Sequence, residues 1–461
     1  MYTNPIQNER WRALNCHYKD ISKQHMRDWF KNDSTRFSRY SFQVGEILFD
    51  YSRNRINDET LALLCELAES MQLSQKITHL FAGDCVNRVE KRPALHTALR
   101  DQAHHAIEMD GVNIDPLITE TLNRMEQLTD QLHSQALLGV TGKPIITIVV
   151  LGVGGSSLGA EMCYHALKDF RVTNLQCHFV SSIDKTAIQD LMAQINPETT
   201  MFIVASKTFK TLETLTNFRF FLAWMRERLG EVVVEKHFIA ITANLNEALT
   251  YRLPKQHIFP IWNWVGGRYS IWSAMGLPLM FLIGCKAFHA FLVGAFEMDQ
   301  HFRLAPFSQN MPVLLALLSL WYVNFFRAHA HAVVPYSYRL RYLTTYLQQM
   351  SMESNGKSTN IDGECIDYFT GPVIFGNEGC HGQHAYHQLL HQGQHLIPVD
   401  FILTGKLPRD SHHDMLVASG LSQALALMSG KTHREAERDL LAQHYSKEEA
   451  AYLAAHQVNV G

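Results

Sequence analysis

The sequence predicts an α/β protein with two units built on parallel sheets and a helical amino-terminal arm. Its 461 residues exceed what a single hydrophobic core usually serves, so two domains are expected. From Pro144 onward, short β-branched runs alternate with segments of helix length, which is typical of parallel strands joined by crossover helices. Residues 1–140 carry amphipathic patterns and almost no strand-like runs, which predicts helices there.

The individual elements follow from the spacing of apolar residues. Amphipathic helices are predicted in the arm, for example over 59–71 and 94–109. Strands of the first unit are predicted at 145–150, 177–180, 201–205 and 238–241. An apolar helical stretch over 278–328 could link and cover two sheets. The second unit is predicted to have strands at 332–335, 372–375 and 397–403, and helices at 340–352, 383–392 and 412–428.

Composition excludes several classes of protein. Forty-six per cent apolar residues, 18 per cent charged residues and a net charge of −3 describe an ordinary globular chain, not a general nucleic-acid binder. Eight scattered cysteines favour free thiols over a disulfide framework or a zinc site. The amino terminus lacks an apolar signal segment, and the apolar run 311–326 is too short to span a bilayer. We therefore expect a cytoplasmic protein that binds neither membrane nor nucleic acid.

A glycine-rich turn follows the first predicted strand, in the run Gly152-Val153-Gly154-Gly155-Ser156-Ser157. Glycines permit close backbone approach to a ligand, and the hydroxyls of Ser156 and Ser157 are possible donors to an anion at the start of the next helix. As a dinucleotide fingerprint the run fails, because Ser157 occupies the third glycine position. A tight strand-to-helix turn with no ligand is the alternative reading.

A second polar turn follows the strand at 201–205. It contains Ser206, Lys207, Thr208 and Thr211, and so brings hydroxyl groups to the start of a helix. Such a turn suits a phosphate monoester, which needs several donors and the positive end of a helix dipole. Helix caps also use serine and threonine without binding any ligand. Two such turns at strand ends of one sheet favour an anion site.

Two further segments carry side chains suited to chemistry. Arg268 follows Gly266 and Gly267, and could stabilise a negatively charged oxygen that develops during a reaction. Gln349 and Glu353 are four residues apart near the end of the helix predicted over 340–352, and Glu353 is the candidate proton-transfer base. A surface arginine in an ion pair and a solvated terminal glutamate are the ordinary alternatives for these two charged residues.

A histidine-rich segment follows the strand at 372–375. We predict that a single helix carries His384, His387, His391 and His395, with the imidazoles roughly on one face. No carboxylate or cysteine pattern accompanies them, so a metal site is disfavoured. His384, beside the preceding loop, is better placed for acid–base work.

Together these segments resemble the phosphoglucose isomerase family. The resemblance begins at Asn87-Arg88-Val89-Glu90-Lys91-Arg92 and reaches the chain end, with signature blocks in the family's order. The blocks Trp264-Val265-Gly266-Gly267-Arg268-Tyr269-Ser270 and Met352-Glu353-Ser354-Asn355-Gly356-Lys357 match the family pattern without change.

The resemblance implies two sugar-isomerase (SIS) domains, each a three-layer α/β unit with a parallel sheet. The chain would divide into a helical arm that packs on the large domain (1–115), a first domain (116–285) and a second domain (286–461). It also implies a homodimer and interconversion of glucose 6-phosphate and fructose 6-phosphate, in glycolysis and gluconeogenesis, without a cofactor or a metal.

Residue roles also follow from the resemblance by matching position. The phosphate would be held by Ser156, Ser206, Lys207, Thr208 and Thr211. Gly267 and Gln349 would contact the bound sugar, and Arg268 would stabilise a cis-enediolate. Glu353 would move a proton between carbon 1 and carbon 2, and His384 would assist ring opening, in its own or the neighbouring subunit's site.

The chain departs from the family pattern in four places. Ser157 replaces a usual aspartate, Lys210 a usual threonine and His381 a usual asparagine. The chain also stops at Gly461, where the family continues through a Gly-Asn-Arg-Pro block and a lysine that works with the histidine in ring opening. A catalytically impaired phosphosugar-binding protein is therefore the alternative function.

Overall fold

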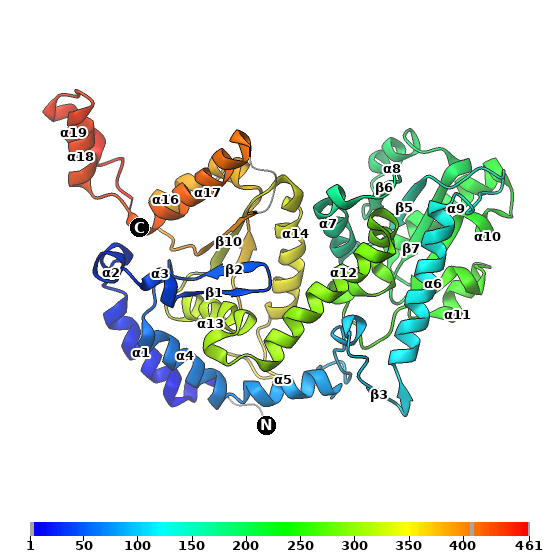
Figure 1. Cartoon of the computed structure of the whole chain (residues 1–461), viewed down its shortest axis with the longest axis horizontal. Helices are drawn as coiled ribbons and strands as arrows, with labels where there is room; N and C mark the ends of the chain where they lie inside the picture. The colour runs from blue at the N-terminus through cyan, green and yellow to red at the C-terminus, as the bar shows by residue number, and fades with distance from the viewer. Residues whose placement is uncertain (1–3, 406–409, 460–461) are drawn as a thin grey trace. The chain divides into compact units, whose positions relative to one another are not determined.

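The computed structural model describes residues 4–405 and 410–459, which form two compact units (Figure 1). The central unit is Gln75–Asp299, and the split unit joins Met1–Ser74 to Gln300–Gly461. Val460 and Gly461, where the chain is expected to stop short of the family pattern, lie outside the described residues. The division into an arm (1–115) and two sugar-isomerase domains (116–285 and 286–461) stays a prediction.

The central unit contains a parallel sheet of five strands in the order β6-β5-β7-β8-β9. The strands are β5 (Thr147–Leu151), β6 (Gln176–Val180), β7 (Thr200–Ala205), β8 (Phe238–Thr242) and β9 (Ile258–Pro260). Four of them confirm the predicted strands. β9 was not predicted, because three residues ending in proline give too short an apolar pattern.

Helices cover both faces of this sheet and make three layers. Every residue of β5, β7 and β8 is buried, as expected for parallel strands between two helical layers. Ile148 and Val150 pack into one core with residues of α6 (Asp115–His133), α7 (Leu158–Ala166) and α12 (Leu277–Leu304). Val149 and Leu151 face the other core, with α8 (Lys185–Met192) and α9 (Leu212–Leu229).

Short elements complete the central unit, and one prediction here is wrong. The unit also has α10 (Val233–His237), α11 (Leu245–Thr250) and a hairpin of β3 (Glu108–Met109) and β4 (Val112–Asn113). Residues 94–109 do not form the predicted helix; they contain a 3-10 turn, Ala98–Arg100, and end in the strand β3. The Asp101 carboxylate accepts hydrogen bonds from the N–H groups of Ala103 and His105, so local side-chain bonding replaces helical bonding.

The split unit contains a parallel sheet of three strands in the order β11-β10-β12. β10 (Ala330–Tyr336), β11 (Val373–Phe375) and β12 (Val399–Leu403) confirm the strands predicted for the second unit. Ala332, Val334 and Tyr336 form the core beside α17 (Ser411–Ser429). The α/β class with parallel sheets is therefore confirmed in both units.

A second core of the split unit joins the amino-terminal helices to α13 (Met311–Asn324). The indole of Trp321 is fully buried among residues of α1 (Glu9–Ile21) and α4 (Asp58–Ser70), and its Nε1 donates to the Arg55 carbonyl at 3.0 Å. The helical prediction for 59–71 is confirmed by α4. The remaining amino-terminal elements of the split unit are α2 (Met26–Asn32), α3 (Arg36–Arg39), β1 (Ser41–Val44) and β2 (Ile47–Asp50). The next helix, α5 (Leu73–Ala82), lies mostly in the central unit.

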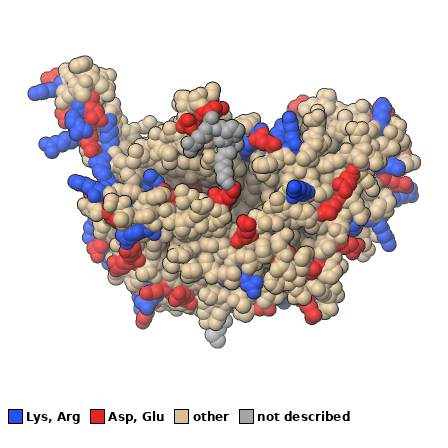
Figure 2. Space-filling view, viewed as in Figure 1, with Lys and Arg blue, Asp and Glu red and all other residues tan. Residues whose placement is uncertain are grey.

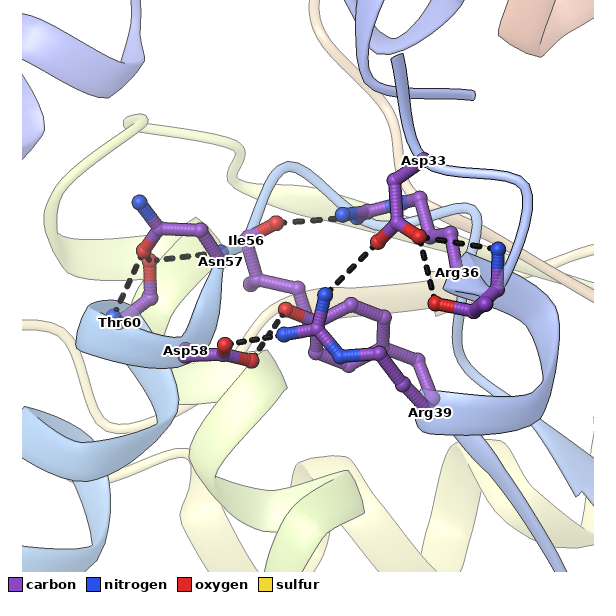
Figure 3. Close-up of polar contacts among 9 residues, drawn as sticks. Asp33, Arg36, Arg39, Ile56, Asn57, Asp58 and Thr60 are labelled. Carbon is purple, nitrogen blue, oxygen red and sulfur yellow. Dashed lines mark hydrogen bonds and ion pairs between the residues drawn. The ribbon is translucent and has the colours of Figure 1, made fainter. Parts of the chain in front are cut away.

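A buried arginine fixes the loop between β2 and α4 (Figure 3). The guanidinium of Arg36 donates to the carbonyl oxygens of Ser52 at 2.9 Å, Asn54 at 3.0 Å and Ile56 at 2.9 Å. Arg39 pairs with the carboxylates of Asp33 and Asp58 beside it. Arg36 is 3% exposed, and these three carbonyl partners offset the cost of removing its charge from water.

A charged helical hairpin ends the described chain. Lysine, arginine and acidic side chains crowd the surface of α18 (His433–Ala442) and α19 (Lys447–Ala454) in Figure 2. Each helix begins with a capping box, Thr432 with Glu435 and Ser446 with Glu449. Arg27 of α2 holds the hairpin by donating to Glu435 and to two backbone carbonyls.

Among the described residues, one helical segment, Ala274–Leu304, is long and apolar enough to cross a membrane by length and composition. Its residues from Leu277 to Ile283 belong to the core of the central unit. Gly284 interrupts the helix with a φ of 78° and a ψ of 164°. A buried core helix passes the same test of length and composition, so this segment is weak evidence for a membrane span.

Candidate active site

The glycine-rich turn after β5 lies at the carboxyl edge of the central sheet. Gly154, with a φ of 57°, opens a 3-10 turn that ends at Ser156 and leads into α7. A Cβ on Gly155 would lie 2.3 Å from the carbonyl carbon of Gly267 and 2.6 Å from the backbone nitrogen of Arg268. Only glycine fits there, so this turn and the Arg268 segment are in close backbone contact.

The polar turn after β7 lies beside the glycine-rich turn, because β5 and β7 are neighbours in the sheet. Ser206 is buried, and its hydroxyl lies 3.1 Å from the hydroxyl of Thr211 at the start of α9. Thr208 is exposed, and its carbonyl accepts from the Asn244 side chain at 3.1 Å. Hydroxyl groups and a helix amino terminus therefore gather at this edge, as a phosphate monoester requires.

An aromatic side chain sets the shape of this polar turn. Phe209 has a φ of 51° and is fully buried. Its ring packs against Phe218 and Tyr251 at centroid distances of 6.1 and 5.9 Å. A left-handed conformation costs a non-glycine residue of the order of 1–3 kcal/mol and persists only where packing enforces it. Burial of the Phe209 ring thus holds Thr208 on the exposed side of the turn.

Arg268 lies in the segment after β9, at the same sheet edge. The segment folds as a 3-10 helix, Gly267–Trp272, and the Ser270 hydroxyl donates to the Gly155 carbonyl at 2.8 Å. The Tyr269 ring stacks on His96 with centroids 4.7 Å apart. Removal of the His96 ring from water lowers its pKa to about 3, and Arg100 adds to this effect. A neutral, packed imidazole therefore supports the residue next to Arg268.

Gln349 and Glu353 lie in the split unit, on a π-helix. The predicted helix over 340–352 is observed as α14 (Leu343–Gln348) followed by the π-helix Gln349–Glu353. Such wide turns are rare and are frequent at functional sites. The Gln349 Oε1 atom is buried and has no hydrogen-bond partner among the described residues, whereas Glu353 is exposed. Gly356 closes the helix, since its N–H donates to the Met352 carbonyl at 2.8 Å.

His384 lies between two short helices, so the prediction of a single histidine-bearing helix is wrong. α15 (Gly379–Gln383) ends just before His384, which is its C-cap, and α16 begins three residues after His384 (His387–Gln392). Gly382, inside α15, lies close to the Tyr386 ring, since an added Cβ would be 2.6 Å from the Tyr386 hydroxyl. Gln383 anchors the segment by donating to the Tyr336 hydroxyl at 2.8 Å and to Ser419 at 2.7 Å.

Two other histidines of this segment, His387 and His391, belong to a different hydrogen-bond network. His387 and His391 share the Oε1 atom of Gln423, at 3.1 and 2.9 Å. The Asn459 side chain bonds the other ring nitrogen of His391 at 2.9 Å. These imidazoles thus tie α16 to α17 and to the end of the described chain.

The structure brings seven predicted residues together at one edge of the central sheet. They are Ser156, Ser206, Lys207, Thr208, Thr211, Gly267 and Arg268. Gln349, Glu353 and His384 belong to the split unit, where the π-helix contacts β11 and β11 leads to α15.

Three residues were expected to depart from the family pattern, namely Ser157, Lys210 and His381. Ser157 is the most buried of them. It is 1% exposed, and its Oγ has no hydrogen-bond partner among the described residues. Lys210 and His381 are exposed, and the imidazole of His381 lies 3.9 Å from the carboxylate of Glu378.

Comparison with known proteins decides the family. A family model described as "Phosphoglucose isomerase" matches residues 50–461. The glucose-6-phosphate isomerase of Shewanella oneidensis is 47% identical over 458 residues, which cover 99% of this chain and 84% of that protein. The glucose-6-phosphate isomerase of Methylococcus capsulatus is 44% identical and is covered to 82%, with 96% of this chain aligned. The chain belongs to the phosphoglucose isomerase family.

A solved structure of the phosphoglucose isomerase family agrees with the fold described above. The crystal structure of a glucose-6-phosphate isomerase from Chlamydia trachomatis superposes with a TM-score of 0.84 at 30% identity, covering 93% of this chain and 83% of that chain. A hypothetical protein from Thermus thermophilus, at 23% identity and a TM-score of 0.62, shares the fold alone.

In this member of the phosphoglucose isomerase family, the contacts that join the loops could not be predicted from the sequence. Ser270 bonds Gly155 across 115 residues, and Lys207 bonds Asn263 across 56 residues. Local spacing carries no signal for partners so far apart. The glycine pairs Gly154–Gly155 and Gly266–Gly267 were the one available sign of close backbone approach.

Proposed function

We propose that this chain is a glucose-6-phosphate isomerase, an intramolecular oxidoreductase that interconverts glucose 6-phosphate and fructose 6-phosphate. The observation that carries the proposal is the meeting of two polar strand-end turns with the Arg268 segment at one sheet edge, in a chain of the phosphoglucose isomerase family. The sequence blocks around Arg268 and Glu353 support the same reaction.

The phosphate group occupies the edge of the central sheet. Ser156, Ser206, Thr208 and Thr211 offer hydroxyl donors there, and the amino terminus of α9 adds the positive end of its dipole. Several donors to one anion give charge-assisted hydrogen bonds, which are stronger than neutral ones.

Proton transfer is the chemical step. Glu353 removes a proton from carbon 2 of the open-chain aldose and returns it to carbon 1, through a cis-enediolate whose developing negative charge Arg268 stabilises. Gln349 orients the sugar, and Gly267 allows its close approach. His384 exchanges a proton with the ring oxygen during ring opening. These assignments rest on matching position and on residue chemistry.

We also propose a homodimer that works in the cytoplasm, in which His384 serves the neighbouring subunit's site. Sedimentation of the purified chain tests the dimer. Mixing an H384A chain with an E353Q chain tests the shared site, because a mixed dimer would regain one complete site if the two residues come from different subunits.

The proposed activity is tested directly. Purified chain is given fructose 6-phosphate, and formation of glucose 6-phosphate is followed by a coupled dehydrogenase assay. Turnover is expected in the wild type, and a strongly reduced but still measurable kcat is expected in the R268M chain. Calorimetric binding of fructose 6-phosphate without any turnover would replace the isomerase with a phosphosugar-binding protein.

A further inference from the structure

The ammonium group of Lys207 is directed at the backbone of another loop. Its Nζ donates to the carbonyl oxygen of Asn263 at 2.9 Å and to that of Val265 at 2.8 Å. Lys207 follows β7, and both acceptors follow β9, so the side chain joins two strand-end turns of the central sheet. Two of the three ammonium protons are thereby used within the protein.

The segment 263–265 is held from three directions. The carbonyl of Trp264, between the two Lys207 acceptors, accepts from the N–H of Leu95 at 3.0 Å. Arg92 donates to the Asn263 carbonyl at 3.1 Å, alongside Lys207. Three successive carbonyls are therefore fixed from outside their own segment, which leaves it little freedom to shift.

The other end of the Lys207 connection is fixed as well. The carbonyl of Lys207 accepts from the N–H of Ala243 at 2.9 Å and from the hydroxyl of Thr242 at 3.1 Å. Since both ends are held, the lysine side chain sets the distance between the turn after β7 and the segment that leads to Arg268.

The position of Arg268 depends on the segment 263–265. Only Gly266 and Gly267 separate Val265 from Arg268, and glycines transmit no side-chain packing of their own. The Tyr269 N–H donates to the Gly266 carbonyl at 3.0 Å, and Ser270 bonds Gly155. Loss of the Lys207 contacts would release the Val265 carbonyl, which is the held carbonyl nearest to Arg268, and would leave the Asn263 carbonyl with Arg92.

We propose that the Lys207 side chain is a positioning residue for Arg268, and that it does not hold the substrate phosphate through its charge. This inference rests on the proposed isomerase function and refines its site. Arg268 then meets the developing negative charge on the enediolate from a fixed position, without a reorganisation step.

The electrostatic surroundings of the lysine agree with this role. Partial burial and the nearby Arg92 lower the pKa of Lys207 to about 8, and Glu90 offsets this only in part. The acceptors of both ammonium hydrogen bonds are neutral carbonyl oxygens, those of Asn263 and Val265. A lysine built to bind an anion is better served by a fully charged ammonium with its protons unused.

The test compares K207M with K210M. Both variants remove one lysine from the same turn and keep a side chain of similar length, but Lys210 is exposed. Rates with fructose 6-phosphate give kcat and KM, and inorganic phosphate is used as a competing ligand that reports the phosphate site alone. We expect K207M to lower kcat about 10- to 10²-fold, as a 1 Å misplacement does. Inhibition by phosphate should change less than about 3-fold, and K210M should resemble the wild type.

A double-variant cycle with R268M separates positioning from a general loss of structure. If Lys207 acts through Arg268, K207M has little further effect on kcat in the R268M chain. The proposal would be overturned if K207M lowered kcat by the same factor in the R268M chain as in the wild type. It would also be overturned if K207M left kcat unchanged and weakened inhibition by phosphate about tenfold. K207R serves as the second variant: it keeps the charge but cannot place one nitrogen against both carbonyls, so it should not restore kcat.

Hydrogen exchange makes the inference independent of turnover. Amides of residues 262–268 should exchange faster in K207M than in the wild type or in K210M. If the wild type lacks isomerase activity, the proposed function fails, whereas this exchange still reports whether Lys207 fixes the segment. Equal exchange in all three chains would contradict the positioning role.

Discussion

The hydroxyl of Ser270 donates a hydrogen bond of 2.8 Å to the carbonyl oxygen of Gly155. This bond joins the segment that carries Arg268 to the turn that carries Ser156. Because the backbones touch at Gly155 and Gly267, any added atom at this point must move one turn away from the other.

The first prediction concerns Gly155→Ala. The new methyl group would lie 2.3 Å from the carbonyl carbon of Gly267, so the Arg268 segment must shift. We expect kcat/KM for fructose 6-phosphate to fall about 10²-fold, the cost of a displacement near 1 Å. Gly294→Ala is the matched control, since nothing lies within 4 Å of its added Cβ. Full activity in G155A would show that the contact does not constrain the site.

The second prediction concerns Glu353→Gln, which removes the base and keeps the shape of the side chain. Loss of proton transfer should lower kcat by about 10²–10⁴-fold while the dissociation constant for a phosphosugar stays nearly constant. Exchange of the carbon 2 hydrogen with solvent, followed by NMR in deuterium oxide, measures the step itself. Glu437→Gln on α18 makes the same charge change away from the π-helix. Parallel loss of exchange and affinity would argue against a base.

The third prediction concerns the pH dependence of the α18 attachment. Hydrogen bonds from Thr432, and then from Arg27, lower the pKa of Glu435 from 4.5 to about 2. A carboxyl whose pKa is lower in the folded state contributes stability above pH 4.5, and this contribution is lost as the pH falls toward 2. Amide exchange in α18, corrected for its intrinsic pH dependence, should therefore accelerate over this range. E435Q should remove that part of the dependence, and an unchanged profile in E435Q would rule out this carboxyl as its source.

The fourth prediction concerns the ion pair of Arg100 and Asp299, whose side chains are 11% and 9% exposed. The guanidinium donates two hydrogen bonds of 2.6 Å to the carboxylate. R100L leaves a buried, unpaired carboxylate and should lower the free energy of unfolding by about 3–5 kcal/mol. The double variant R100L/D299L should recover most of that loss. Urea denaturation measures both, and a double variant less stable than R100L would contradict the argument.

The sequence predicts most of the sheet strands and the residues at their carboxyl ends. Long β-branched runs identified β5, β7 and β8, and turn residues after them identified Ser156, Ser206 and Thr211. These features are local, because each side chain lies within a few residues of the strand that positions it.

Features that depend on contacts between distant residues could not be predicted from the sequence. The helix predicted over 94–109 does not form. Leu95 and Leu99 are instead buried in the core of the central unit from an irregular segment. The helix predicted to carry His384 is broken after Gln383, whose side chain is held by the distant residues Tyr336 and Ser419. Tertiary packing decided both outcomes against local periodicity.

The π-helix that ends at Glu353 has a consequence for how this part of the chain tolerates change. A π turn holds about one residue more than an α turn of the same helix. Deletion of Ser351 would therefore convert the π turn into an ordinary α turn, and the residues after it would keep nearly the same facing. Deletion of one residue within α14 would instead turn Glu353 by roughly 100° about the helix axis. A single lost codon is thus absorbed at the π-helix but changes the direction of the Glu353 carboxylate when it falls in the helix before it.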